Sequence, residues 1–100
     1  MKLPPVKSHT FRGRRWTVGR SEHRDPDERG VCEAPWTDHK VIDVPVHGGT
    51  VGELDTLLHE SLHACMWDMD EEAIHESARD IARFLWRLGW RKGIEVRDGR

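Results

Sequence analysis

The chain lacks a long apolar run, and it has only two cysteines among its 100 residues. No stretch of about 20 residues is apolar enough to cross a bilayer. The basic start MKLPPVKSHTFRGRRW is not followed by the hydrophobic segment of a signal peptide. We therefore expect a cytoplasmic protein without a membrane partner. Cys32 and Cys65 lack the close spacing of a zinc ribbon or a redox pair, so we expect two free thiols, with a disulfide between them as the alternative.

Neither sign of charge dominates. The 18 acidic and 16 basic residues leave a formal net charge of -2, which argues against nucleic acid as the main partner. A local basic cluster is interpreted as a solvated face rather than a binding patch; it comprises Arg12, Arg14, Arg15 and Arg20. The length predicts a single domain, residues 1–100, with one modest core, and we expect a monomer.

Proline is absent after residue 49, which divides the chain into two parts. The first part, about residues 10–47, contains the β-like runs FRGRRWTV, GVCEAP and KVIDVPV, which predict a small antiparallel sheet. The polar stretch GRSEHRDPDERG between the first two runs predicts a loop. Pro45 in the third run indicates an edge strand, because proline cannot donate to a ladder.

The second part predicts two helices, and the whole therefore an α+β fold. Thr50 and Glu53 form a capping-box pair at the start of a helix over residues 51–67. Asp70 caps a second helix over residues 71–89, which ends at Gly89. Residues 90–100 form a C-terminal tail. Each helix has an apolar face, composed of Leu54, Leu57, Leu58, Leu62 and Cys65 in the first and Ile74, Ala78, Ile81, Leu85 and Leu88 in the second.

The first helix contains the sequence His59-Glu60-Ser61-Leu62-His63, which matches H-E-x-x-H. Residues four apart lie one above the other on a helix, so both imidazoles can bind one cation. Zinc suits neutral imidazole ligands, and Glu60 lies close enough to take a proton from a water molecule at such a site. Both histidines lie on the side of the helix away from its leucines. We therefore expect one zinc ion per chain.

A catalytic zinc normally has a third protein ligand. The tripeptide His-Glu-Ser recurs at residues 75–77, and a helical hairpin places His63 level with residues 75–76 and His59 level with about 79–80. This register favours His75 or Glu76 as the ligand and Asp80 as the neighbour of His59. The helical face then favours Glu76, with Glu71, Glu72 and His75 as alternatives. In this interpretation the two His-Glu-Ser copies are two halves of one site.

The run HESLH followed by ESARDI resembles the gluzincin metallopeptidases, which combine HExxH with a glutamate helix reading ExxxD. The chain is most similar to minigluzincins and to small phage-borne zinc peptidases, with the likeness strongest over residues 41–90. The resemblance implies that His59, His63 and Glu76 bind zinc, that Glu60 is the general base and acid, and that Asp80 orients His59. The chain has no tyrosine, so the phenolic donor of some relatives is absent or replaced.

The expected function is therefore hydrolysis of peptide bonds in a peptide or protein substrate. The edge strand around Val41–Val46 is expected to hold the substrate backbone. The alternative is a non-catalytic zinc-stabilised binding domain. Glu60 argues against that alternative, because hydrolysis requires a base between the histidines and a structural site does not. The tail around Asp98 either blocks the site, as in some minigluzincins, or is a frayed end.

Overall fold

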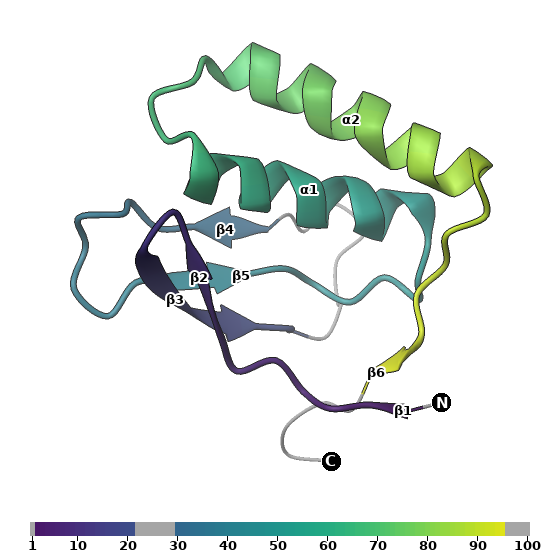
Figure 1. The fold of residues 1–100 in the computed structure, drawn as a ribbon, viewed down its shortest axis with the longest axis horizontal. Coiled ribbons are helices and arrows are strands. Elements are labelled where there is room, and N and C mark those ends of the chain that lie inside the picture. Colours follow the sequence, from purple (N-terminus) through teal and green to yellow (C-terminus); the bar gives the residue numbers. More distant parts are fainter. Residues whose placement is uncertain (1, 22–29, 96–100) are drawn as a thin grey trace.

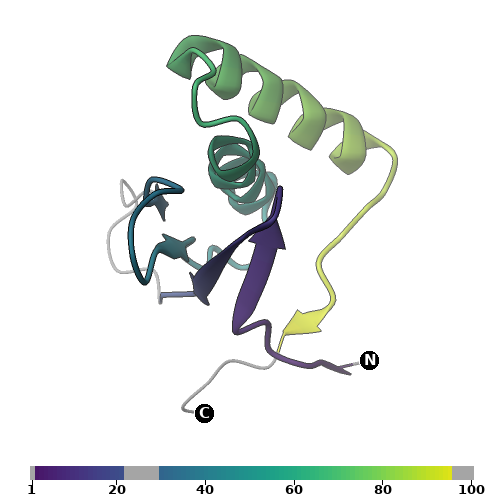
Figure 2. The same ribbon diagram turned by 60° about the vertical axis from the view of Figure 1, so that its left-hand side comes forward.

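A computed structural model describes residues 2–21 and 30–95 and shows an α+β fold of three layers (Figure 1). A sheet forms the first layer, helix α1 lies across it, and helix α2 lies on the far side of α1, as the turned view confirms (Figure 2). The elements in chain order are β1 (Lys2–Leu3), β2 (Ser8–Phe11), β3 (Arg14–Gly19), β4 (Val31–Cys32), β5 (Val41–Asp43), α1 (Val51–Cys65), α2 (Glu71–Arg87) and β6 (Ile94–Glu95).

The main sheet is mixed, whereas the sequence analysis expects an antiparallel one. Its strand order is β2-β3-β5-β4. The β2–β3 and β4–β5 pairs are antiparallel, but β3 and β5 run parallel, with Thr17 opposite Val41. Strand β4 occupies the outer position, and β5, which follows it in the chain, occupies an inner one. The α+β prediction is confirmed, with this correction to the sheet.

The run FRGRRWTV contains a hairpin turn that the sequence analysis does not identify. Arg12 and Gly13 both have positive φ, 48° and 79°, as the two central residues of a tight type I′ turn require. The turn brings Arg12 to the end of α1, where its Nη1 donates to the carbonyl oxygen of Cys65 at 2.9 Å. The guanidinium thus satisfies a carbonyl in the last turn of α1, at the negative end of the helix dipole.

Pro45 does not mark an edge strand, because β5 ends two residues earlier at Asp43. Beyond that end, Val44 N–H and Val46 N–H still donate to Gly19 and Ser21 on the β3 side. Successive N–H groups point to opposite sides of an extended chain, so Pro45 faces away from β3 and removes no bond of that pairing. The outer strand on this side of the described sheet is β4.

Both helices begin where the sequence predicts and end two residues earlier. Thr50 accepts a hydrogen bond from Glu53 N–H, and Asp70 accepts one from Ala73 N–H. The first helix ends at Cys65 rather than residue 67, and the second at Arg87 rather than residue 89. Gly89 follows with φ of 98°, the left-handed conformation expected just beyond a helix.

The core between the sheet and α1 is built on Trp16, which is fully buried against Ile42 and Ala64. Its indole N–H donates to the Glu33 carbonyl at 3.0 Å, so burial leaves no unpaired donor.

The residues of α2 buried on the inner side are Ile74, Ala78 and Ala82. The expected apolar faces are only partly correct. In α1 the leucines are only half-buried, and the buried residues are Glu53, Glu60 and Ala64. In α2 the predicted apolar residues Ile81 and Leu88 are exposed.

The segment after α2 returns to the start of the chain. Strand β6 pairs in parallel with β1, with Ile94 opposite Lys2, and Lys92 Nζ lies 3.1 Å from a carboxylate oxygen of Glu53. Residue Asp98, named above as a candidate blocking group, and residues 22–29 of the predicted loop lie outside the described residues. Within the described residues, neither helix has the length and apolar character that a membrane span requires.

Candidate metal centre

The two histidines of HExxH lie one above the other on α1, as the helical spacing predicts. Their Nε2 atoms are 3.2 Å apart, and their ring centroids are separated by 4.8 Å. The side chains of His59 and His63 are 20% and 18% exposed, so both are partly sheltered but reachable from solvent. Two imidazole nitrogens therefore point toward one place at the surface of the helix.

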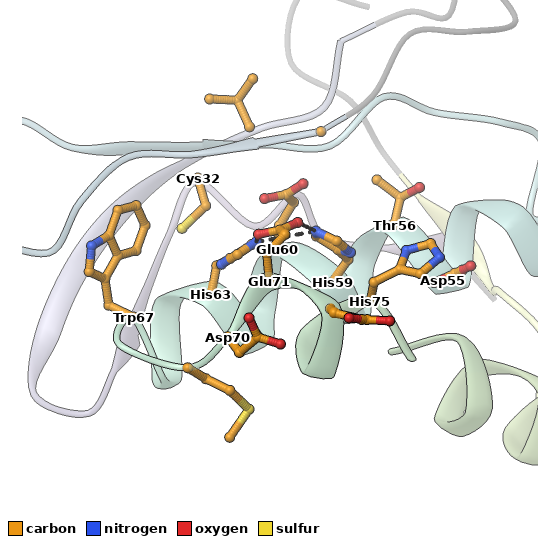
Figure 3. A pocket seen from close by; sticks show the side chains of 14 residues that line it. Cys32, Asp55, Thr56, His59, Glu60, His63, Trp67, Asp70, Glu71 and His75 are labelled. Atoms are coloured by element: carbon orange, nitrogen blue, oxygen red, sulfur yellow. Dashed lines mark hydrogen bonds and ion pairs between the residues drawn. The ribbon is translucent and has the colours of Figure 1, made fainter. Parts of the chain in front are cut away.

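The third donor at this place is Glu71, the first residue of α2. One carboxylate oxygen lies 3.0 Å from His59 Nε2 and the other 2.9 Å from His63 Nε2. Figure 3 shows the three side chains converging between the two helices. Among the described residues, only these three His, Cys, Asp and Glu side chains form a group whose donor atoms all lie within 4.8 Å of one another.

Glu76 and Asp80, which the sequence analysis places at the site, do not line the cleft that holds the histidines. Both are exposed, and Asp80 lies 3.4 Å from the neighbouring Arg79. The helical geometry explains the difference. The face of α2 that packs toward α1 carries Ile74, Ala78 and Ala82, and Glu71 is three residues before Ile74, on that same face. Glu76 is two residues from Ile74 and points the other way.

The second His-Glu-Ser copy therefore contributes only its histidine to the cleft. The ring centroid of His75 lies 6.1 Å from that of His59, at the rim. Glu72, another alternative from the sequence, also lines the cleft and is exposed. One signal in the sequence could have identified Glu71 rather than Glu76 as the third donor. A residue of α2 that reaches α1 must lie on the apolar face of α2, and Glu71 has the spacing that places it there.

Glu60 is buried, with 6% of its surface exposed, and lies between α1 and the strand β4. Gly30, just before β4, makes this position possible. A Cβ atom at Gly30 would lie 2.7 Å from Glu60 Cγ, closer than Cβ atoms approach other atoms, and 3.0 Å from Glu60 Oε2, which is an unusually tight contact. Glycine is therefore required here by the close approach of the backbone to the Glu60 side chain, a role that sequence analysis alone does not reveal.

The surroundings of Glu60 change its proton affinity and that of a nearby thiol. Burial raises the pKa of Glu60; the proximity of His59 opposes this shift, and the Glu71 carboxylate adds to it. Burial also raises the pKa of the Cys32 thiol to about 12, and the negative charge of Glu60 contributes. Cys32 is therefore a neutral thiol at physiological pH. Cys32 and Cys65 are both half-buried free thiols in this structure.

The donors open into a cleft of about 1130 Å³ between β4, α1 and the beginning of α2. Trp67 forms one end of the cleft, and its ring lies 6.0 Å from that of His63. Trp36 packs edge-on against Trp67 at 5.7 Å and is 70% exposed. Figure 3 shows Trp67 at one end and His75 at the other, with His63 and His59 between them, so the donors lie along the cleft.

The donor set fits a tetrahedral transition-metal ion. Ligands about 2.0–2.2 Å from a tetrahedral zinc ion lie about 3.3–3.6 Å from one another. The observed separations of 2.9–3.2 Å between the three side chains require only small movements to reach these values. Two imidazoles and one carboxylate suit zinc better than calcium or magnesium, which prefer oxygen donors.

Comparisons of the chain with protein-family models, with curated proteins and with solved structures gave no match.

Proposed function

We propose that the protein is a zinc-dependent peptidase in which His59, His63 and Glu71 hold the metal and Glu60 is the general base. The observation that supports this most strongly is the convergence of two imidazoles and a carboxylate from a second helix on one point, 2.9–3.2 Å apart. The resemblance of HESLH to the gluzincin motif supports the same proposal. The proposal includes one zinc ion per chain and a cytoplasmic location, both of which are expected from the sequence.

The three ligands and the cleft favour a catalytic over a purely structural site. Structural zinc sites are closed by four protein ligands and are rich in cysteine. Here the described residues supply three donors, Cys32 is a neutral thiol, and the donors face a cleft of about 1130 Å³. The open side leaves room for water and substrate.

A zinc ion at this place supplies Lewis acidity, which makes water more acidic and polarises a carbonyl group. Glu60 is positioned to accept the proton that water loses and to deliver it to the leaving amine. It follows His59 directly in α1, lines the same cleft, and lies close to the backbone of Gly30 on its other side. Proton transfer by such a group contributes about 10²–10⁴-fold to the rate.

The outer strand β4 is the candidate for holding an extended substrate. Val31 is 55% exposed, and Gly30, Val31 and Cys32 all line the cleft. In the described sheet β4 pairs with β5 on one side only, so its other edge can pair with a peptide backbone. This strand takes the place of the run Val41–Val46, because strand β5 at the start of that run already pairs with β3 on one side and β4 on the other.

The experiment that tests the proposal combines metal analysis with peptide cleavage. We expect purified protein to bind one zinc ion per chain, to cleave members of a mixed peptide library, and to lose cleavage with a chelator and regain it with added zinc. His59→Ala is expected to lose the metal, whereas His75→Ala, a histidine at the rim of the same cleft, retains it. Chelation is also expected to lower the melting temperature, because metal binding couples to folding.

Protein that binds no zinc and has the same melting temperature with and without it would overturn the proposed site. Protein that binds zinc but cleaves no peptide would favour the zinc-stabilised binding domain instead.

A further inference from the structure

Helix α2 has more apolar surface than α1 covers. Its inner residues Ile74, Ala78 and Ala82 are buried. Next to them, Ile81, Phe84 and Leu88 are 40%, 63% and 61% exposed. Spacings of three and four residues place these three side chains in one row along the helix, which we call the outer stripe. An exposed row of large apolar side chains of this kind is typical of a helix that packs against another helix.

Two opposite charges border the outer stripe. Asp80 precedes Ile81 and Arg87 precedes Leu88, so both stand on the same side of the row, two helical turns apart. Both residues are exposed, and the side chain of Asp80 remains 71% exposed beside Arg79. The negative charge lies toward the start of the helix and the positive charge toward its end.

We propose that the outer stripe binds the outer stripe of a second copy of this chain, with the two α2 helices antiparallel about a two-fold axis. In this arrangement Phe84 of each copy packs against Ile81 of the other. Asp80 of each copy then lies beside Arg87 of the other, and symmetry repeats this ion pair. The stripe is thus complementary to itself in both its apolar row and its charges. The sequence analysis, by contrast, expects a monomer.

The charges also select this register over its nearest alternatives. A shift of seven residues in one direction brings Asp80 beside Asp80 of the other copy, and a shift in the other direction brings Arg87 beside Arg87. Like charges at these positions oppose association. The residues of the stripe do not line the cleft that holds His59 and His63, so the dimer leaves that cleft open.

Sedimentation equilibrium from micromolar to millimolar chain concentration tests the dimer. We expect wild type to show a monomer–dimer equilibrium and Phe84→Asp to be monomeric. Asp80→Arg and Arg87→Asp should each weaken the dimer, roughly tenfold, because two attractive pairs become repulsive. An equimolar mixture of these two variants should form a heterodimer, since each chain then meets the opposite charge at both pairs. The double variant Asp80→Arg/Arg87→Asp should regain the wild-type affinity.

Glu72→Arg is the matched control. It makes the same charge change as Asp80→Arg at an exposed position of α2 on the far side of the helix from the outer stripe, and it should leave the affinity of the dimer close to that of wild type. Circular dichroism should show that every variant is folded. Monomeric wild type throughout the concentration range would overturn the proposal. So would a dimer that persists in Phe84→Asp, or a mixture of the two charge variants that fails to associate.

Discussion

Glu71 lies 2.9 Å from Nε2 of His63, although the two residues belong to different helices. The contact depends on how α2 begins. Asp70 accepts the N–H of Ala73 and so fixes the first turn of the helix, which places Glu71 at its first position. The candidate metal centre is therefore completed by the turn between the helices, and not by the second His-Glu-Ser copy further along α2.

The first prediction concerns the third ligand. Glu71→Ala should weaken zinc binding by more than about 100-fold, because loss of a ligand should exceed the 10–100-fold losses typical of changes to groups that only orient ligands. Glu76→Ala and Glu72→Ala are matched controls that remove an exposed glutamate from the same helix, and each should bind zinc within a few-fold of wild type. Competition with a coloured zinc chelator measures all three affinities. A greater loss of zinc affinity in Glu76→Ala than in Glu71→Ala would favour Glu76 as the third ligand, as the sequence analysis predicts.

The second prediction concerns Gly30. A methyl group here would lie 2.7 Å from Glu60 Cγ and 3.0 Å from Thr56 Cγ2, so Gly30→Ala must displace the Glu60 side chain. We expect peptide cleavage to fall by about 10-fold or more, because a small misplacement of a catalytic group is costly. Zinc affinity should change little. The measurement is kcat/KM at saturating zinc.

Gly52→Ala is the control for Gly30→Ala. A Cβ atom at Gly52, in the first turn of α1, has its nearest neighbour at an ordinary distance of 3.7 Å, Thr50 Oγ1. This variant should retain full activity and be slightly more stable, since alanine is the better helix former. Equal activity of Gly30→Ala and Gly52→Ala would show that Gly30 does not position Glu60.

Glu53 joins four segments of the fold through one buried carboxylate. Its Oε1 accepts N–H bonds from His47 and Gly49 at 2.9 Å each, and its Oε2 pairs with Arg20 and with Lys92. Burial by itself would raise the pKa of Glu53. The two backbone N–H groups and the two cations oppose this and together lower it to about 2.

The third prediction follows from this lowered pKa. Because the folded-state pKa is below the unfolded value, the stabilisation is fully present above about pH 4.5 and is lost as the pH falls toward 2. It amounts to roughly 3 kcal/mol. Urea unfolding should show Glu53→Gln much less stable than wild type at pH 7, with the difference shrinking as pH falls below 4.5. Glu72→Gln, an exposed glutamate, is the control and should show no such difference. A gap between wild type and Glu53→Gln that stays constant with pH would contradict this account.

Most of the helical part of the fold follows from local signals in the sequence. Thr50 and Asp70 indicate where the two helices begin, because their side-chain oxygens can accept a hydrogen bond from a free N–H group of the first turn. The spacing of His59 and His63 then places both imidazoles on one side of α1. These features depend on neighbours within four residues, and such features can be read without knowledge of the rest of the chain.

The features that the sequence does not predict depend on distant packing. The parallel pairing of β3 and β5 brings together residues more than 20 positions apart, and no local pattern encodes it. The choice of Glu71 over Glu76 depends on which face of α2 meets α1, and Ala82 belongs to that face although alanine carries little signal. Gly30 is essential only because Glu60 lies against it.

The most direct measurement is peptide cleavage by Glu60→Gln compared with wild type at equal zinc occupancy. Glu60 is not among the donors that converge on the metal site, so the variant should bind zinc and fold as wild type does. It should nevertheless lose cleavage by about 10²–10⁴-fold or more, because an amide cannot accept the proton from water. Cleavage by the variant equal to that of wild type, at the same zinc occupancy, would contradict the assignment of Glu60 as the base.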